Sequence, residues 1–333
     1  MRVLVVTNMY PYPETPAFGV FVEDQVESLR RRGVEVDVLF MNGRESTLNY
    51  AWGIARIWKR LLTRRYDLVH AHYVFSGLAA RMQFLRPVVL THHGVEVFWG
   101  GQAWLSRRIT RFFDQVIVVS EEMRRRLPYP DAHVIPCGVN MDRFQPMPKA
   151  EARRHLGLPE DKKLVLWAGE YFRPEKRYEL VEEAVRLLQE DDDSVELVLL
   201  SGKAHDDVPA YMNACDVLLL VSDGEGSPMV VKEAMACNLP VVAHLVGDVE
   251  QIIGGTEGCH ICSQDPRDIA DKARLALDRG ERTRGREVVQ HLSIDTIAER
   301  ITDVYGQALS SANGPRIDAT QEARAAQGEL VKG

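Results

Sequence analysis

The sequence predicts an α/β protein built from two doubly wound domains in tandem, each on a parallel sheet. The chain has 333 residues, which is enough for two domains of about 150 residues each. Short apolar runs alternate with amphipathic stretches along most of the chain, and this alternation is typical of βαβ units. It stops at Phe144–Asp161, a stretch rich in Pro and in charged residues such as Lys149 and Glu151, and then begins again. We therefore expect a linker in that stretch.

The first series of elements occupies residues 1–145 and should form the first domain. Its helical stretch Val20–Arg32 carries Phe21, Val22, Val26 and Leu29 at helical spacing. The expected strands are Val3–Val6, Val34–Phe40, Leu68–His70, Val88–Thr91, Val116–Val119 and His133–Ile135.

The second series occupies residues 146–292 and should form the second domain. Its expected strands are Leu164–Ala168, Val195–Leu200, Val217–Leu220, Pro240–Ala243 and Gly258–Ile261. Its expected helices are Tyr178–Gln189, Val208–Ala214, Pro228–Cys237 and Asp265–Leu277. Ligands of such sheets bind beyond the carboxyl ends of the strands, so a cleft between the two domains is the expected site. Residues 313–333 hold few large apolar side chains and should form a disordered tail.

Composition indicates a soluble globular protein, with 45% hydrophobic and 27% charged residues. No apolar run reaches the roughly 18 residues that span a bilayer, and the N-terminus begins as a strand rather than a signal peptide. We expect a cytoplasmic protein. The five cysteines are odd in number and scattered, which argues against a disulfide framework. The pair Cys259 and Cys262 lacks further zinc ligands, so we expect a reduced, partly buried loop there and no metal.

The charge is distributed unevenly. Residues 1–150 hold 20 Lys and Arg against 14 Asp and Glu, a net charge of +6, whereas the rest holds 21 against 34, a net charge of −13. The first domain therefore suits anionic partners such as acidic lipid surfaces or phosphate-bearing acceptors. The stretch Tyr50–Arg65 should pack its apolar side on the sheet and turn its basic side toward an anionic acceptor or the inner face of a membrane. The sequence contains no stripe of basic residues interleaved with aromatics, so nucleic-acid binding is not indicated.

The segment Asp223–Cys237 contains the largest number of candidate ligand-binding residues. Ser227 followed by Pro228 is typical of a helix start, with Ser as N-cap and Pro at the first helical position. A helix start after a strand offers N–H groups to an anion, here from Ser227, Met229 and Val230. Glu233 is surrounded in the sequence by mostly apolar residues, which suggests that it is buried. Because a buried carboxylate is costly without a partner, we expect it to bind a ribose diol or a Lys. Glu225, in a Gly-flanked loop, is a ligand contact or an exposed turn carboxylate.

Three further loops follow predicted strands. Arg173 and Lys176, three residues apart, suit a diphosphate but also fit a solvated charged turn. His93 precedes Gly94 after the fourth strand, where a lone His is usually structural. Gly19 lies in the loop after the first strand, where it permits close approach of the backbone to a ligand. No G-x-G-x-x-G fingerprint of a dinucleotide site is present.

The spacing Glu225-x7-Glu233, set in E-G-S-P and K-E-A-M-A-C-N-L-P-V-V, resembles the signature of family 4 of the retaining glycosyltransferases. The resemblance covers about residues 1–310. It implies the GT-B fold, in which two Rossmann-like domains face each other across a cleft, with the acceptor entering on the side of the first domain and the nucleotide sugar bound by the second. It also implies a final helix at Ser293–Leu309. This helix crosses back to the first domain, to which residues 293–310 would belong. Two departures are Asn238, where Gly is usual, and Glu170, where Arg is usual.

The same resemblance implies roles for the site residues. Glu225 would contact the donor sugar and Glu233 would hold the ribose. Arg173 and Lys176 would neutralise the leaving diphosphate, and His93 would approach the reaction centre. The remaining donor contacts would be Gly19, Gly226, Ser227, Pro228, Met229 and Val230.

The function that the resemblance implies is transfer of a sugar from a UDP- or GDP-type donor to a glycan or lipid-linked acceptor, with retention at the anomeric carbon. The branch building teichuronic-acid-like and capsular polysaccharides is the most similar. No cofactor and no metal are implied, because the nucleotide sugar is a substrate. Two alternatives stay open at this point: a sugar-nucleotide epimerase of the same architecture, and a non-catalytic sugar-nucleotide-binding subunit.

Overall fold

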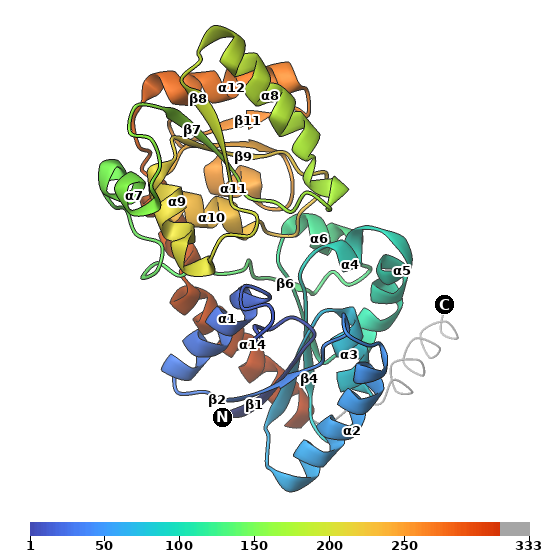
Figure 1. The fold of residues 1–333 in the computed structure, drawn as a ribbon. Helices are drawn as coiled ribbons and strands as arrows, with labels where there is room; N and C mark the ends of the chain where they lie inside the picture. Colours follow the sequence, from blue (N-terminus) through green and yellow to red (C-terminus); the bar gives the residue numbers. More distant parts are fainter. Residues whose placement is uncertain (314–333) are drawn as a thin grey trace, which may run out of the picture.

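The protein forms two lobes, each built on its own parallel sheet (Figure 1). The structure, a computed structural model, describes residues 1–313. All eleven predicted strands are present, with ends within two residues of those expected. The predicted tail lies outside the described residues, apart from Asn313 at the end of the last helix.

The first sheet has six strands in the order β2-β1-β3-β4-β5-β6, all parallel. The chain leaves β1 for β2 on one side and then passes to β3 on the other. The carboxyl ends of β1 and β3 therefore flank a topological switch point, where doubly wound sheets bind ligands. The strands are β1 (Arg2–Thr7), β2 (Glu35–Phe40), β3 (Leu68–His72), β4 (Val88–His92), β5 (Gln115–Val118) and β6 (His133–Val134).

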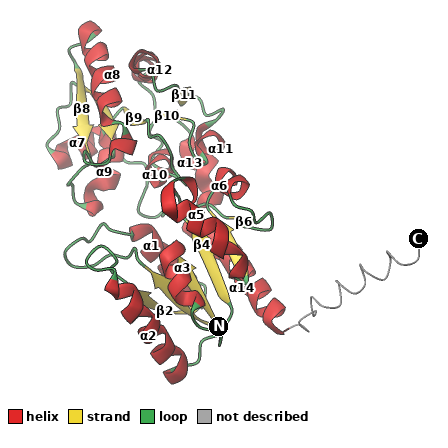
Figure 2. Ribbon diagram, turned by 90° about the vertical axis from the view of Figure 1, so that its right-hand side faces the viewer, coloured by secondary structure: helices red, strands yellow, loops and turns green. Residues whose placement is uncertain are grey.

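Helices cover both faces of this sheet (Figure 2). Alternate residues of β1 point to opposite faces, so Val3 and Val5 pack with α1 (Val20–Arg31) and α14 (Ile294–Asn313). Leu4 and Val6 pack in a separate core on the other face. The helices on that side are α2 (Leu48–Thr63), α3 (Val74–Arg81) and α5 (Gly100–Ile109), while α4 (Val95–Phe98), η1 (Thr110–Phe112) and α6 (Glu121–Arg126) are short connections.

The second sheet has five parallel strands in the order β11-β10-β9-β7-β8, so β7 and β9 flank its switch point. Its strands are β7 (Lys163–Trp167), β8 (Val195–Leu199), β9 (Val217–Leu220), β10 (Val241–His244) and β11 (His260–Cys262). Its helices are α7 (Lys149–Leu156), η2 (Pro174–Lys176), α8 (Tyr178–Asp191), η3 (His205–Asp207), α9 (Val208–Ala214), α10 (Met229–Ala236), α11 (Val249–Ile253), α12 (Pro266–Arg279), α13 (Gly285–Val288) and η4 (Val289–Leu292).

The stretch Phe144–Asp161, which we expect to be a linker, contains the helix α7, which the sequence analysis did not predict. Arg153 of α7 is buried, and its guanidinium donates to the carbonyl of Ala214 at 2.9 Å and to the carboxylate of Asp216 at 2.8 Å. A buried guanidinium with these partners fixes α7 to the second lobe. This helix was missed in the sequence because its buried face includes the charged Arg153, so the apolar periodicity of a packed helix is weak there. The exact domain boundary near residue 145 stays a prediction.

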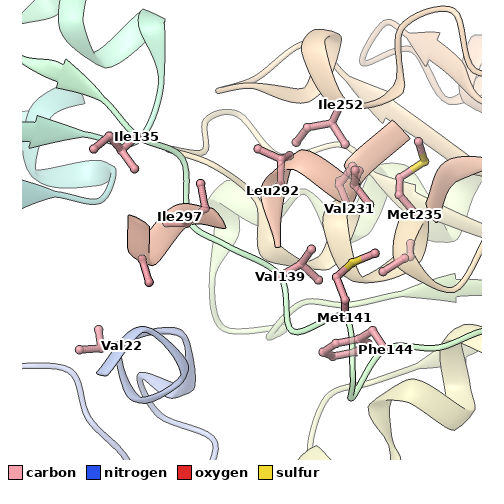
Figure 3. Packing of buried hydrophobic residues seen from close by; sticks show 14 of the residues in the cluster. Val22, Ile135, Val139, Met141, Phe144, Val231, Met235, Ile252, Leu292 and Ile297 are labelled. Atoms are coloured by element: carbon pink, nitrogen blue, oxygen red, sulfur yellow. The ribbon is translucent and has the colours of Figure 1, made fainter. Parts of the chain in front are cut away.

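The chain crosses between the lobes twice, and the two crossings lie side by side. Val139 donates to the carbonyl of Leu292 at 2.9 Å, and its own carbonyl accepts from Ile294 at 3.0 Å. Figure 3 shows Val139 and Met141 among apolar side chains of α10 and of the segment before α14. One apolar core therefore continues from the first lobe through the crossings into the second. From there α14 runs back along α1 (Figure 1).

Candidate active site

A pocket of about 370 Å³ lies between the two lobes, at the switch points of both sheets. The first lobe contributes the loop after β1 and the start of α1, including Gly19. The second lobe contributes Arg173 from the loop after β7, and Met229 and Glu233 from α10. The structure thus brings four of the predicted site residues to one cavity. The full lining is Met9, Thr15, Ala17, Phe18, Gly19, Val20, Phe21, Asp24, Arg44, Glu170, Arg173, Met229 and Glu233.

The lobes also touch backbone to backbone, at Gly226. A Cβ atom on Gly226 would lie 2.0 Å from the carbonyl oxygen of His93, and one on Gly94 would lie 3.4 Å from the nitrogen of Gly226. The loops after β4 and β9 therefore meet at a distance that only glycine at position 226 permits. This contact brings the His93-Gly94 segment next to Glu225, as the resemblance implied that both approach one reaction centre.

Glu225 and Lys176 form an ion pair. The Lys176 ammonium donates to Oε1 of Glu225 at 2.5 Å, and both side chains are mostly buried. The backbone N–H of Asp223 donates to the carbonyl of Glu175 at 2.9 Å, which ties the loops after β7 and β9 together. Arg173 is more exposed, and Nη2 lies 2.7 Å from Oε1 of Glu175. Each predicted cation therefore already has a carboxylate partner in the cleft.

The predicted helix start at Ser227 is wrong by one residue. The helix α10 begins at Met229 with Pro228 as its N-cap, and the Ser227 side chain caps nothing. Instead, its hydroxyl donates to Oδ2 of Asp248 at 2.6 Å and accepts from the Lys232 ammonium. The buried charges of Lys232 and Asp248 need partners, so they draw the hydroxyl away from the backbone N–H groups.

Lys232 also links the lobes, and the sequence analysis did not identify it. Its ammonium is fully buried, lies 3.2 Å from Oδ2 of Asp248 and donates to the carbonyl of Cys137 at 2.8 Å. Cys137 belongs to the segment that crosses from the first lobe. A Lys within the apolar run Val-Val-Lys-Glu-Ala-Met-Ala was the one available signal, because a buried ammonium is retained only with partners.

Glu233 faces the cleft pocket and is partly exposed. Burial, followed by the negative charge of Asp24, raises the pKa of Glu233 to about 7. Within residues 1–313, the Glu233 carboxylate forms no ion pair and accepts no hydrogen bond. The alternative that Glu233 pairs with a Lys is therefore not observed, because the neighbouring Lys232 is bonded to Ser227 and Asp248.

His93 is buried and engaged at both ring nitrogens. Nε2 lies 2.9 Å from Nδ1 of His72, and Nδ1 lies 3.7 Å from Sγ of Cys137. Burial, followed by the neighbouring His72 and His92, lowers the pKa of His93 well below its usual value, so the ring is neutral. Its carbonyl oxygen, rather than its ring, makes the contact with Gly226 described above.

Glu96 fixes the backbone of the His93-Gly94 turn through hydrogen bonds. The Glu96 carboxylate is fully buried and accepts from the backbone N–H of His93 at 2.6 Å and of Gly94 at 3.0 Å. Burial raises the pKa of Glu96 to about 7. Of the other histidines, His70 bonds the Tyr305 hydroxyl and Thr91 at 2.7 Å each, which is a core role linking β3 to α14.

Tyr73, which sequence reasoning also missed, has a strained backbone. Its φ of 70° and ψ of 153° lie in a region that is almost restricted to glycine. The residue directly follows β3 at the switch point, and its ring centroid lies 5.0 Å from that of His93. Burial, followed by the charges of Glu96 and Cys137, raises the pKa of the Tyr73 hydroxyl. Composition carries no signal for such strain, which depends on the packing around the residue.

Gly19 and the cysteine pair have local explanations. Gly19 has φ of 74°, and a Cβ there would lie 2.5 Å from the carbonyl carbon of Met9, so it allows the loop after β1 to fold back on itself as it enters α1.

The sulfur of Cys259 lies 3.7 Å from Sδ of Met235, and Cys262 ends β11 rather than lying in a loop. In the part of the chain that the structure describes, no three His, Cys, Asp or Glu residues could together hold a metal ion.

Two family models match the chain and together span most of it. Residues 3–143 match the model described as Glycosyltransferase Family 4. Residues 162–279 match the model described as Glycosyl transferases group 1. The two matches fall on the two lobes.

Comparison with individual proteins agrees with these matches. The chain is 28% identical over 325 residues to TuaC of Bacillus subtilis strain 168, named as a glycosyltransferase of teichuronic acid biosynthesis, covering 76% of this chain and 83% of that protein. The fold is similar to sucrose-phosphate synthase from Thermosynechococcus elongatus, with a TM-score of 0.76, 22% identity and 93% and 99% of the two chains covered. It is also similar to Anabaena HepE in complex with UDP and glucose, with a TM-score of 0.70, 16% identity and 92% and 99% covered.

Proposed function

The chain belongs to the family 4 glycosyltransferases of group 1, with the GT-B fold, and from that premise we propose that it is a retaining transferase acting on a UDP- or GDP-type sugar donor. The acceptor would be a glycan or lipid-linked glycan in the synthesis of a cell-surface polysaccharide. One observation carries the proposal: the cleft pocket joins Gly19 of the first lobe to Arg173, Met229 and Glu233 of the second. The name of TuaC supports the choice of pathway.

The donor would lie along this pocket, from Glu233 toward Glu225. The Glu233 carboxylate has no partner in residues 1–313, so it can accept hydrogen bonds from both ribose hydroxyls. The N–H groups of Met229 and Val230, in the first turn of α10, would donate to a phosphate oxygen at the helix start. Arg173 would hold the diphosphate as a bidentate donor. Lys176 would hold a phosphate oxygen and Glu225 together, because its ammonium already donates to that carboxylate.

During transfer, the bond between the anomeric carbon and the phosphate oxygen breaks, and its electron pair stays on the departing diphosphate. The acceptor hydroxyl oxygen forms the new bond to the anomeric carbon and gives its proton to the departing phosphate oxygen. Charge therefore accumulates on the diphosphate, where Arg173, Lys176 and the start of α10 supply positive charge. These groups support a reaction that requires no metal ion of its own. His93, neutral and fixed by His72 and Glu96, would present its backbone to the donor sugar.

A contact with an anionic membrane surface is part of the proposal. Residues 46–113 hold ten Lys and Arg but two acidic residues, of which Glu96 is buried. The same stretch exposes Trp52, Leu62 and Phe84, while Ile57 and Leu61 of α2 pack on the sheet. Among residues 1–313, no helix is both long and apolar enough to cross a bilayer. Peripheral binding predicts co-sedimentation with phosphatidylglycerol vesicles that high salt abolishes; binding that persists equally on neutral vesicles contradicts it.

The decisive test of the proposed function is product analysis with purified protein and EDTA. UDP- and GDP-sugars are incubated with and without a bacterial lipid-linked glycan extract. The proposal expects release of the nucleoside diphosphate and a new α-linked sugar on the acceptor, at a rate that EDTA leaves unchanged. Conversion of the donor to its epimer without acceptor would instead identify an epimerase. Donor binding without any turnover would identify a non-catalytic subunit.

A further inference from the structure

A second cavity lies in the first lobe, beyond the carboxyl ends of β1 and β2. Its volume is about 860 Å³, more than twice that of the cleft pocket, and the start of α2 closes one side. None of the residues assigned to the donor lines it. The lining residues are Tyr12, Glu14, Val38, Phe40, Met41, Asn42, Arg44, Glu45, Asn49, Trp52 and Arg56.

Arg44 connects this cavity to the donor pocket, because it lines both. Its guanidinium lies over the ring of Phe18, 4.0 Å from the ring centroid, and Phe18 also lines the donor pocket. Phe21, which also lines that pocket, lies with its ring centroid 5.0 Å from that of His93. A molecule in the cavity would therefore lie next to the donor, on the side of the donor pocket formed by Arg44 and Phe18.

The cavity walls combine aromatic faces with polar side chains. Trp52 is 69% exposed at the rim, and the rings of Tyr12 and Phe40 pack against each other with centroids 5.6 Å apart. Asn42 and Asn49 add amide groups, and the Asn49 amide donates to the carbonyl of Asn42 at 2.8 Å. A sugar ring has an apolar C–H face that can stack on an indole and a rim of hydroxyls that both donate and accept.

The charges in the cavity are balanced. Two arginines, Arg44 and Arg56, stand against two glutamates, Glu14 and Glu45. Within the described residues, none of these four side chains forms an ion pair with another residue. An anionic ligand would meet two carboxylates there and lose part of the attraction of the arginines. A ligand bearing only hydroxyls can instead donate to the carboxylates and accept from the guanidinium groups.

We propose that this cavity binds the sugar acceptor and that the acceptor's terminal unit is an uncharged saccharide stacked on Trp52. The inference rests on the proposed glycosyl transfer, in which the acceptor enters on the side of the first lobe, and adds to it the particular cavity and the chemical class of the acceptor. Arg44, common to both pockets, would then contact the acceptor beside the donor. A lipid carrier attached to that saccharide would leave the cavity past Trp52, on the basic surface of α2.

Saturation-transfer NMR on the full chain tests this directly. The probes are methyl glycosides and short oligosaccharides of neutral hexoses and N-acetylhexosamines, with uronic acids and sugar phosphates at matched millimolar concentration. We expect binding of one or more neutral probes, and a loss of about tenfold or more in affinity in Trp52→Ala. Trp104→Ala is the matched control, because Trp104 on α5 is 61% exposed and does not line the cavity. It should bind the probes as the wild type does.

Thermal shifts with UDP and GDP, measured on the same three proteins, separate this inference from the proposed function. Both variants should keep the nucleotide shift of the wild type, because neither residue lines the donor pocket. The inference is overturned if no neutral probe binds the wild type, if only charged probes bind, or if both Trp variants lose binding equally. Absence of any nucleotide shift in the wild type would overturn the proposed function, while the NMR result still decides the occupant of the cavity.

Discussion

At the scale of single residues, the site depends on carboxylates whose surroundings differ. Glu225 is neutralised by Lys176, whereas Glu233 lies partly buried without a partner in residues 1–313. The Glu-x7-Glu spacing identified both residues in the sequence, but it did not separate their environments. The difference arises from Lys176, which is 49 positions away from Glu225 and reaches it only after folding. Contacts of this kind have no local sequence signal.

The raised pKa of Glu233 predicts a pH dependence of nucleotide binding. A ribose diol prefers the carboxylate form, so binding lowers a pKa that is about 7 in the free protein. Affinity for UDP or GDP should therefore rise with pH up to about 7 and level off above it. Titration calorimetry between pH 5.5 and 8.5 measures this, and the ratio of wild type to Glu233→Gln cancels the ionisation of the nucleotide itself. A ratio that does not change with pH contradicts the assignment of Glu233 to the ribose.

At the scale of elements, strands were the easiest feature to predict. Parallel strands covered on both faces appear in a sequence as short continuous apolar runs, as β3 and β9 do, and every one of these runs became a strand. The helix α7 was missed because its anchor is a buried arginine. The N-cap of α10 was misassigned because Ser227 bonds to Lys232 and Asp248 instead of to the helix. In both cases a tertiary contact overrode a local propensity.

The contact between the loops after β4 and β9 predicts the effect of a single methyl group. Gly226→Ala would place Cβ 2.0 Å from the carbonyl oxygen of His93, so the two lobes must move apart at the reaction centre. We expect a loss of about 100-fold in transfer rate, because misplacement by about 1 Å costs that much in other enzymes. Steady-state kinetics measures it. Gly101→Ala, where a Cβ meets nothing within 4 Å, is the matched control. Activity within twofold of the wild type in Gly226→Ala would refute this role of the contact.

At the scale of the whole molecule, the two lobes share an apolar core at their crossings, and the buried Lys232 of the second lobe bonds to the Cys137 carbonyl beside it. The sequence predicted two tandem domains from the restart of the strand and helix pattern. It did not predict how they meet, because the residues that join them are far apart in the sequence. Lys232, for example, bonds to Cys137, which is 95 positions earlier in the sequence.

The buried pair of Lys232 and Asp248 predicts a stability effect. Lys232→Met leaves the Asp248 carboxylate buried without its cation, which should lower the free energy of unfolding by about 3 kcal/mol. Adding Asp248→Asn removes the second charge and should restore much of that loss. Thermal and urea unfolding measure both variants, with Lys59→Met on the exposed side of α2 as the control. If the double variant is no more stable than Lys232→Met, the ion pair is not the source of the effect.

The cleft between the lobes should bind a nucleoside diphosphate sugar through Glu233. A thermal-shift panel of UDP, GDP, ADP and CMP without metal tests it most directly, on wild type, Glu233→Ala and Glu190→Ala. A ligand at 100 times its Kd stabilises a protein by about 2.7 kcal/mol, which is a measurable shift. We expect one diphosphate to stabilise the wild type and Glu190→Ala alike, and Glu233→Ala much less. If no diphosphate shifts the wild type, or if Glu233→Ala responds as strongly as the wild type, the cleft is not the donor site described here.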